Sequence, residues 1–107
     1  MDASSSGGFL GNESSINKAV AVGDASIEIS TPKFRKSYSI RNVSTAAQVI
    51  NLVLSNTDSA IVGTGIQLNP GESFIDSNSE GYRCWTGSVR AIASAGGGSV
   101  AIMERVE

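Results

Sequence analysis

The sequence of 107 residues contains no histidine and only one cysteine, Cys84. Without histidine, it lacks the side chain that most often acts as a general base or binds a metal ion. A single cysteine cannot form an internal disulfide or a cysteine-based zinc site. The composition therefore argues against catalysis, and we predict no enzyme, no catalytic residues, no metal and no cofactor.

Charged residues and long apolar runs are also scarce. Lysine, arginine, aspartate and glutamate make up 17% of the chain, and the net charge is −2 at pH 7. Such a chain lacks the positive field that binding to phosphates requires, so we predict no nucleic-acid partner. No apolar run reaches the roughly 18 residues of a membrane-spanning helix, so we predict no membrane partner. No basic segment followed by an apolar core is present, and we expect no standard secretory signal.

The first 15 residues are rich in serine and glycine, and Phe9 and Leu10 are their only sizeable apolar side chains after Met1. Such a segment cannot bury enough apolar surface to offset its conformational entropy. We therefore expect residues 1–16 to form a flexible arm and residues 17–107 to form one domain. The arm is either a disordered tail or a segment that orders on a partner, with Phe9 and Leu10 as its anchor.

From Asn17 onward, short apolar runs are separated by turn residues. Ile27 and Ile29 alternate with polar neighbours, as do Tyr38 and Ile40, and this period of two is typical of half-buried strands. Residues 46–54 include good helix formers, but their β-branched residues favour a central strand. Eight or nine short strands without a convincing helix predict an all-β fold, a single antiparallel β-sandwich of jelly-roll-like or immunoglobulin-like order.

Turn residues define the second half of the chain. Asn69, Pro70 and Gly71 predict a tight turn, because proline pre-sets φ and glycine tolerates a positive φ. We expect a further short strand over residues 82–85. Residues 89–93 and 100–103 flank a glycine-rich segment and are predicted to pair as the final hairpin.

Two groups of oxygen-bearing side chains could suggest chemistry. Glu72 and Asp76 would lie roughly 13 Å apart on one strand, outside the 5–9.5 Å that glycoside hydrolysis requires. We interpret both as solvated turn residues. Residues 76–81 resemble the first half of a calcium loop, but Gly87 stands where the bidentate glutamate is expected. A polar loop explains this segment without a metal.

The remaining candidates are a thiol and a set of aromatic rings. Cys84 follows Arg83, which could activate the thiol, but a small buried residue is the favoured interpretation. Tyr38, Tyr82 and Trp85 could form a platform on which a carbohydrate stacks. Because Tyr82 and Trp85 would face opposite sides of a regular strand, we favour core or interface packing for these rings.

Half of the eight positive charges lie within nine positions, at Lys33, Arg35, Lys36 and Arg41. This basic cluster either contacts an acidic or phosphate-bearing partner or protects a sheet edge. The predicted partner-binding residues are Phe9, Leu10, Lys33, Arg35 and Lys36.

Four segments, in order, resemble a pattern found in small bacteriophage virion proteins. They are RKSYSIRN (Arg35–Asn42), GIQLNPGES (residues 65–73), TGSVRAIAS (residues 86–94) and SVAIMERVE (residues 99–107). The resemblance implies a small β-sandwich in a phage particle, as a capsid decoration, head-fibre or minor tail component, and it implies no catalytic residues.

We therefore expect a structural virion protein, made in the bacterial cytoplasm, that binds the capsid or other virion proteins through edge strands, loops and the N-terminal arm. Small sandwiches often protect their edges by pairing with copies of themselves, so we expect a homo-oligomer, with a trimer favoured over a dimer. The alternative is a carbohydrate- or receptor-binding module of a phage tail or other assembly, with Trp85, Tyr82 and residues 76–81 at its site.

Overall fold

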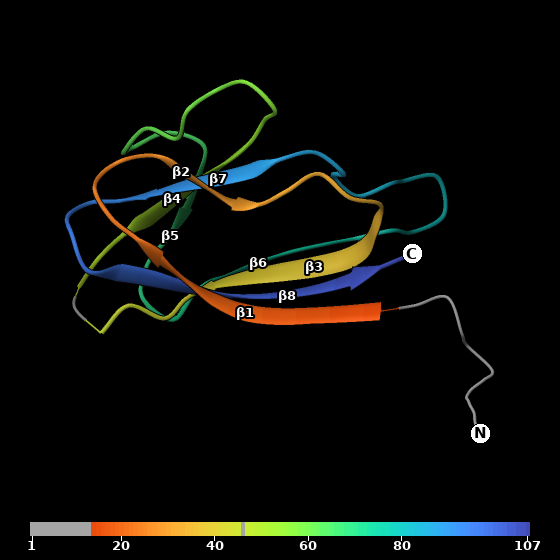
Figure 1. Ribbon diagram of the computed structural model, residues 1–107, viewed down its shortest axis with the longest axis horizontal. Helices are drawn as coiled ribbons and strands as arrows, with labels where there is room; N and C mark the ends of the chain where they lie inside the picture. Colours follow the sequence, from red (N-terminus) through yellow and green to blue (C-terminus); the bar gives the residue numbers. More distant parts are fainter. Residues whose placement is uncertain (1–13, 46) are drawn as a thin grey trace.

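The computed structural model describes residues 14–45 and 47–107, and this part of the chain is built from strands without a helix (Figure 1). The eight strands are β1 (Ser14–Val22), β2 (Ile27–Ser30), β3 (Arg35–Asn42), β4 (Ile50–Leu54), β5 (Ile66–Leu68), β6 (Ser73–Ser77), β7 (Val89–Ala93) and β8 (Gly98–Val106). The predicted all-β class is confirmed. The described residues accordingly offer no helix long and apolar enough to cross a membrane.

The strands form two antiparallel sheets that pack face to face (Figure 1). Sheet A has the order β1-β8-β3-β6, and sheet B has the order β2-β7-β4-β5. Strand β1 pairs with β8, β2 with β7, β3 with β6, and β4 with β5. The first half of the chain therefore lies against the second half like one long hairpin that is rolled into two layers. This nested pairing is the jelly-roll order and decides against the immunoglobulin-like order.

Three local predictions differ from the structure. The predicted final hairpin is wrong, because β7 lies in sheet B and β8 in sheet A, and the turn between them crosses from one sheet to the other. Residues 82–85 are not a strand; Ser79 and Tyr82 form an isolated bridge around a turn in which Gly81 has φ of 79°. Finally, β1 already begins at Ser14, inside the segment predicted to be an arm. Phe9 and Leu10 lie outside the described residues.

The core lies between the sheets and is supplied by alternate residues of the strands. On β3, Tyr38 and Ile40 are buried, whereas Arg41 is exposed. On β7, the three inward positions are filled by one valine and two alanines, which lets the sheets approach closely. The rest of the buried cluster is apolar and includes Ile50, Leu52, Val100 and Ile102.

A buried asparagine joins the sheets at one end of the sandwich. The Asn42 side chain lies at the end of β3 in sheet A and donates hydrogen bonds to the carbonyl oxygens of Leu68 (2.9 Å), in sheet B, and Gln48 (2.8 Å). Its Oδ1 accepts the Ser44 backbone N–H at 3.0 Å. Because each polar group of Asn42 has a partner, burying this amide is not penalised by lost hydrogen bonds.

Residues 55–65 form a covering loop on the outer face of sheet B, seen in green at the top of Figure 1. Asn51 points outward from β4 yet is buried, because its amide donates to Thr64 O (2.9 Å) and accepts from Gly63 N (3.2 Å). Gly65 packs so tightly on β4 that an added Cβ would lie 2.2 Å from Leu52 O. In the described part of the chain, no loop covers the outer face of sheet A in this way.

Candidate functional site

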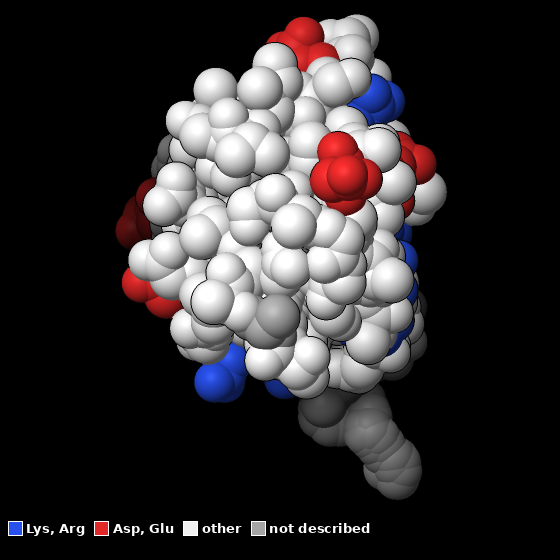
Figure 2. Space-filling model, turned by 90° about the vertical axis from the view of Figure 1, so that its left-hand side faces the viewer, with Lys and Arg blue, Asp and Glu red and all other residues white. Residues whose placement is uncertain are grey.

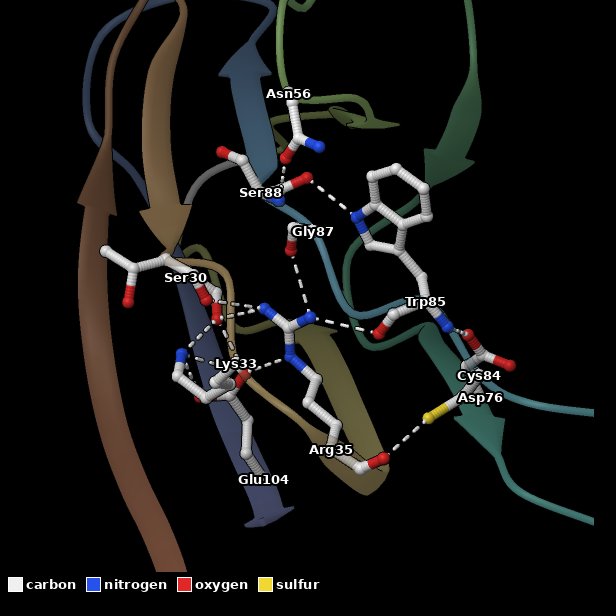
Figure 3. Close-up of polar contacts among 11 residues, drawn as sticks. Ser30, Lys33, Arg35, Asn56, Asp76, Cys84, Trp85, Gly87, Ser88 and Glu104 are labelled. Carbon is white, nitrogen blue, oxygen red and sulfur yellow. Dashed lines mark hydrogen bonds and ion pairs between the residues drawn. The ribbon is translucent and has the colours of Figure 1, made fainter. Parts of the chain in front are cut away.

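A buried ion pair lies between the two sheets at the other end of the sandwich. Arg35 Nε donates to Glu104 Oε2 at 2.7 Å, and both side chains are 0% exposed. The other four guanidinium N–H groups are also occupied (Figure 3). They donate to the carbonyl oxygens of Trp85, Gly87 and Thr31 and to Ser30 Oγ, over 2.8–3.0 Å. Burying a guanidinium requires this degree of pairing, since an unpaired charge in the interior is strongly destabilising.

Ser30 and Lys33 complete the network around Glu104. The Ser30 hydroxyl donates to Glu104 Oε2 at 2.5 Å, and Lys33 Nζ lies 3.2 Å from Glu104 Oε1. Burial works to raise the pKa of Glu104, but the hydrogen bonds and charges of Arg35, Ser30 and Lys33 outweigh it, and the pKa is lowered. Glu104 is therefore ionised at neutral pH, and the network ties β2 of sheet B to β3 and β8 of sheet A.

The predicted basic cluster is divided by the fold. Arg35 is buried, which removes it from any surface that a partner could contact, and most of the Lys33 side chain is also covered. Lys36 and Arg41 are exposed. The alternation of β3, together with the irregular register between Arg35 and Ser37, turns these neighbouring charges in different directions.

Two residues of the segment that resembles a calcium loop, Asp76 and Asn78, use their side-chain oxygens for hydrogen bonds within the protein. Asp76 is buried, so its interpretation as a solvated residue is wrong; Oδ1 accepts the Tyr82 hydroxyl (2.7 Å) and Oδ2 accepts Trp85 N (3.0 Å). Burial works to raise the pKa of Asp76, but these hydrogen bonds outweigh it and lower the pKa. Asn78 Oδ1 accepts Cys84 N at 2.8 Å. Among the described residues, no three histidine, cysteine, aspartate or glutamate side chains group as a metal site.

Cys84 and Tyr38 belong to the core. The Cys84 thiol donates to Arg35 O at 3.3 Å, and burial raises its pKa, so the interpretation of Cys84 as a small buried residue is confirmed. Burial also raises the pKa of Tyr38 above its usual range. Because Tyr38 is buried while Tyr82 is exposed, these rings do not form one stacking platform with Trp85.

An open pocket of about 370 Å³ lies next to the ion pair, between the β2–β3 connection and residues 85–87. Its lining comprises Pro32, Lys33, Phe34, Asn56, Trp85, Thr86 and Gly87. The Trp85 indole is fixed because Nε1 donates to Ser88 O at 2.8 Å and because the ring lies against Gly87, where an added Cβ would be 2.3 Å from Cζ2. Phe34, on the other hand, is 69% exposed.

Sequence reasoning missed Phe34 and Asn56 as pocket residues. Asn56 Oδ1 accepts Ser88 N at 2.8 Å, which holds the side chain beside the indole (Figure 3). Phe34 is a lone aromatic residue in a connection between strands, and Asn56 is a polar residue in a turn; neither has a period or a spacing that marks a site. The one signal in the sequence is that Phe34 is a large aromatic residue outside the alternating pattern of the strands.

The second candidate surface is the open face, which we define as the outward side of sheet A. Ile75, Ser39 and Met103 lie in register across β6, β3 and β8. Ile75 is 71% exposed and Met103 is 48% exposed. Serine and alanine occupy most neighbouring outward positions, so shallow depressions of about 180 Å³ and 380 Å³ flank this row. Strand β1, at the edge of sheet A, leaves backbone groups available for pairing along one side.

Figure 2 views the sandwich from the end opposite the pocket, and this end is largely uncharged. Its described turns comprise residues 23–26, 43–45, 47–49, 69–72 and 94–97, whose charged members are Asp24 and Glu72. Glu72 Oε1 accepts Asn69 N at 2.8 Å within its own turn. Apart from the half-buried Arg90 of β7, the basic side chains therefore lie at the pocket end and on sheet A.

Comparison with known proteins assigns no family. No family model, no curated protein and no solved structure matches the chain. The pocket, the open face and the four segments of the sequence are therefore the features that bear on function.

Proposed function

We propose that this chain is a structural component of a bacteriophage particle, of the capsid decoration or head-fibre type, and that copies of it assemble through the open face of sheet A. The difference between the two outer faces carries the proposal. Sheet B is covered by residues 55–65 of its own chain, whereas Ile75 and Met103 are exposed on sheet A. Ile75 and Met103 lie in one row of this uncovered sheet, on either side of Ser39, and an exposed apolar patch of this kind can form a contact with another protein surface.

The resemblance of four ordered segments to small virion proteins supports the particle context. The jelly-roll fold also occurs in viral capsid and lectin domains. The fold alone therefore does not distinguish a capsid role from carbohydrate binding. A particle component gains affinity by repeating small contacts, so a modest open face is sufficient.

The charges on the open face favour a closed ring over a twofold pair. A face-to-face dimer would place Arg41 of both copies in one interface, whereas no outward strand position of sheet A carries an acidic residue. Contact between the open face of one copy and a different surface of the next avoids this repulsion and closes into a ring when the rotation permits. A closed ring is therefore the expected state, and a trimer is its smallest form.

Light scattering on a gel-filtration peak tests the proposal, because a monomer has a mass of 11.0 kDa. We expect a closed oligomer of the native chain and a monomer after Ile75→Ser with Met103→Ser. Ile61→Ser is the matched control, since Ile61 is 60% exposed but lies on the covering loop. A native chain that is monomeric at all concentrations, or that dissociates equally with Ile61→Ser, would contradict assembly through the open face.

A further inference from the structure

The pocket beside Trp85 has two aromatic walls that the fold holds in place. Trp85 is fixed by its hydrogen bond to Ser88 O and by its contact with Gly87. The Phe34 ring lies under the Arg83 guanidinium, 5.5 Å from its centroid, and Arg83 is itself paired with Glu107 at 3.4 Å. A phenylalanine that is 69% exposed yet held by a cation on one side presents a fixed apolar surface to solvent. Packing against the hydrophobic core does not explain why the Phe34 ring is held at an exposed position.

The polar groups of the pocket are mainly donors. Lys33 is the one charged residue of the lining, and its Nζ donates to Ser30 Oγ at 2.9 Å and pairs with Glu104 Oε1 at 3.2 Å. Because Glu104 also pairs with Arg35, two cations face one carboxylate and the network beside the pocket keeps a net positive charge. Asn56 uses Oδ1 to accept Ser88 N, and within residues 14–45 and 47–107 nothing accepts a hydrogen bond from its Nδ2. A ligand that fits these groups carries acceptor oxygens, with negative charge near Lys33.

We propose that this pocket binds a pyranose that carries a carboxylate, such as a uronic acid residue of a glycan. The C–H face of the sugar ring packs against Trp85 and Phe34. The carboxylate lies beside Asn56 Nδ2, in the field of the neighbouring network of Lys33, Arg35 and Glu104, whose net charge is positive. The volume of about 370 Å³ is in the range of small-molecule sites. A phosphate is the weaker fit, because phosphate sites in proteins generally offer several backbone N–H groups or a bidentate arginine. This site is separate from the open face, so its test does not depend on assembly.

Trp85 is the one tryptophan of the chain, and its fluorescence therefore reports directly on the pocket. The native protein is titrated with D-galacturonate, D-galactose and adenosine monophosphate. We expect a saturable change with galacturonate and affinity for galactose about tenfold weaker, because galactose lacks the charge-assisted hydrogen bonds of the carboxylate. A flat titration with galacturonate, an equal response to galactose, or a stronger response to adenosine monophosphate would overturn the proposal.

Two variants separate the aromatic and polar contributions. Phe34→Ala removes an exposed ring and is expected to weaken galacturonate binding by about fivefold to tenfold, with thermal unfolding unchanged. Asn56→Asp keeps an oxygen that accepts Ser88 N but replaces the free donor with negative charge. It should abolish galacturonate binding and change galactose binding little.

Val43→Ala serves as the control, because Val43 is exposed at the opposite end of the sandwich. It should leave both titrations unchanged. Galacturonate binding that survives both Phe34→Ala and Asn56→Asp would place the ligand elsewhere and refute this site.

Discussion

The two sheets of the sandwich differ in what lies on their outer faces. On sheet B, Asn51 is buried by hydrogen bonds to the covering loop, and Gly65 packs against the backbone of Leu52. On sheet A, the equivalent outward positions hold Ser39 and exposed Ile75. A face that the chain covers itself contributes to the stability of the monomer, whereas an open face contributes little until a partner packs on it. Substitutions on each face, and in the network that joins the sheets, should therefore differ in their effect on the free energy of unfolding.

Glu104→Gln should have the largest effect, because Glu104 is the anion of the network that joins the two sheets at the pocket end. The substitution leaves the charge of Arg35 buried without its counter-ion, which is expected to reduce the free energy of unfolding by about 3–5 kcal/mol. Glu107→Gln breaks the half-exposed pair with Arg83 and should change the free energy of unfolding by less than about 1 kcal/mol. Urea denaturation of both variants measures the contrast. Equal losses would contradict the structural role given to the buried pair.

Gly65→Ala should detach the covering loop from sheet B. Gly65 has φ of 72°, and its added Cβ would lie 2.2 Å from Leu52 O, so the backbone must shift. We expect a loss of about 3 kcal/mol from the left-handed conformation and the steric overlap together. Gly63 has φ of 86° but open space around it, and Gly63→Ala should cost about 1 kcal/mol. Hydrogen exchange of the loop amides distinguishes local detachment from global unfolding.

Asn51→Ala and Ser39→Ala compare one outward position on each face. The first removes two hydrogen bonds to the covering loop and should reduce the free energy of unfolding by about 1–3 kcal/mol. The second changes a small side chain on the open face and should lie within about 0.5 kcal/mol of the native protein. If Ser39→Ala is as destabilising as Asn51→Ala, the two faces contribute equally and the comparison fails.

Acid should weaken the connection between the sheets. The pKa of Glu104 is lowered on folding from an ordinary value of 4.5, so the folded state binds its proton less tightly than the unfolded state. The stability that Glu104 contributes is therefore present above about pH 4.5 and is lost as the pH falls through the lower pKa of the folded protein. The pKa of Asp76 is also lowered on folding, so the stability that Asp76 contributes is lost in acid as well. Denaturation curves from pH 7 to about pH 3 should show this loss, and it should be smaller in Glu104→Gln.

Ile75→Ser should have the smallest effect on stability, within about 0.5 kcal/mol, because the side chain is exposed in the monomer. Analytical ultracentrifugation at matched concentrations should nevertheless show weaker self-association than in the native chain. A large loss of stability in a dilute monomer would mean that the Ile75 side chain packs against its own chain, and would contradict an open face on sheet A.

The sequence predicted the fold class but not the arrangement of the candidate site. Alternation around Ile40 and turn residues such as Pro70 are local properties, so the strands could be recognised from short segments. The contacts of Arg35 with Glu104 and Trp85 join residues 50–69 positions apart, and no local pattern encodes them. For this reason, a buried arginine was predicted to be a surface contact.

The sequence by itself determined that the chain forms short antiparallel strands, since side-chain alternation and turn chemistry act over a few residues. Only the tertiary structure decided which strands share a sheet, as the crossing between β7 and β8 shows. It also decided that Phe34 and Trp85 line one pocket and that sheet B is covered while sheet A is open. These features depend on contacts distant along the chain, whose free energy is realised only when both sheets pack together.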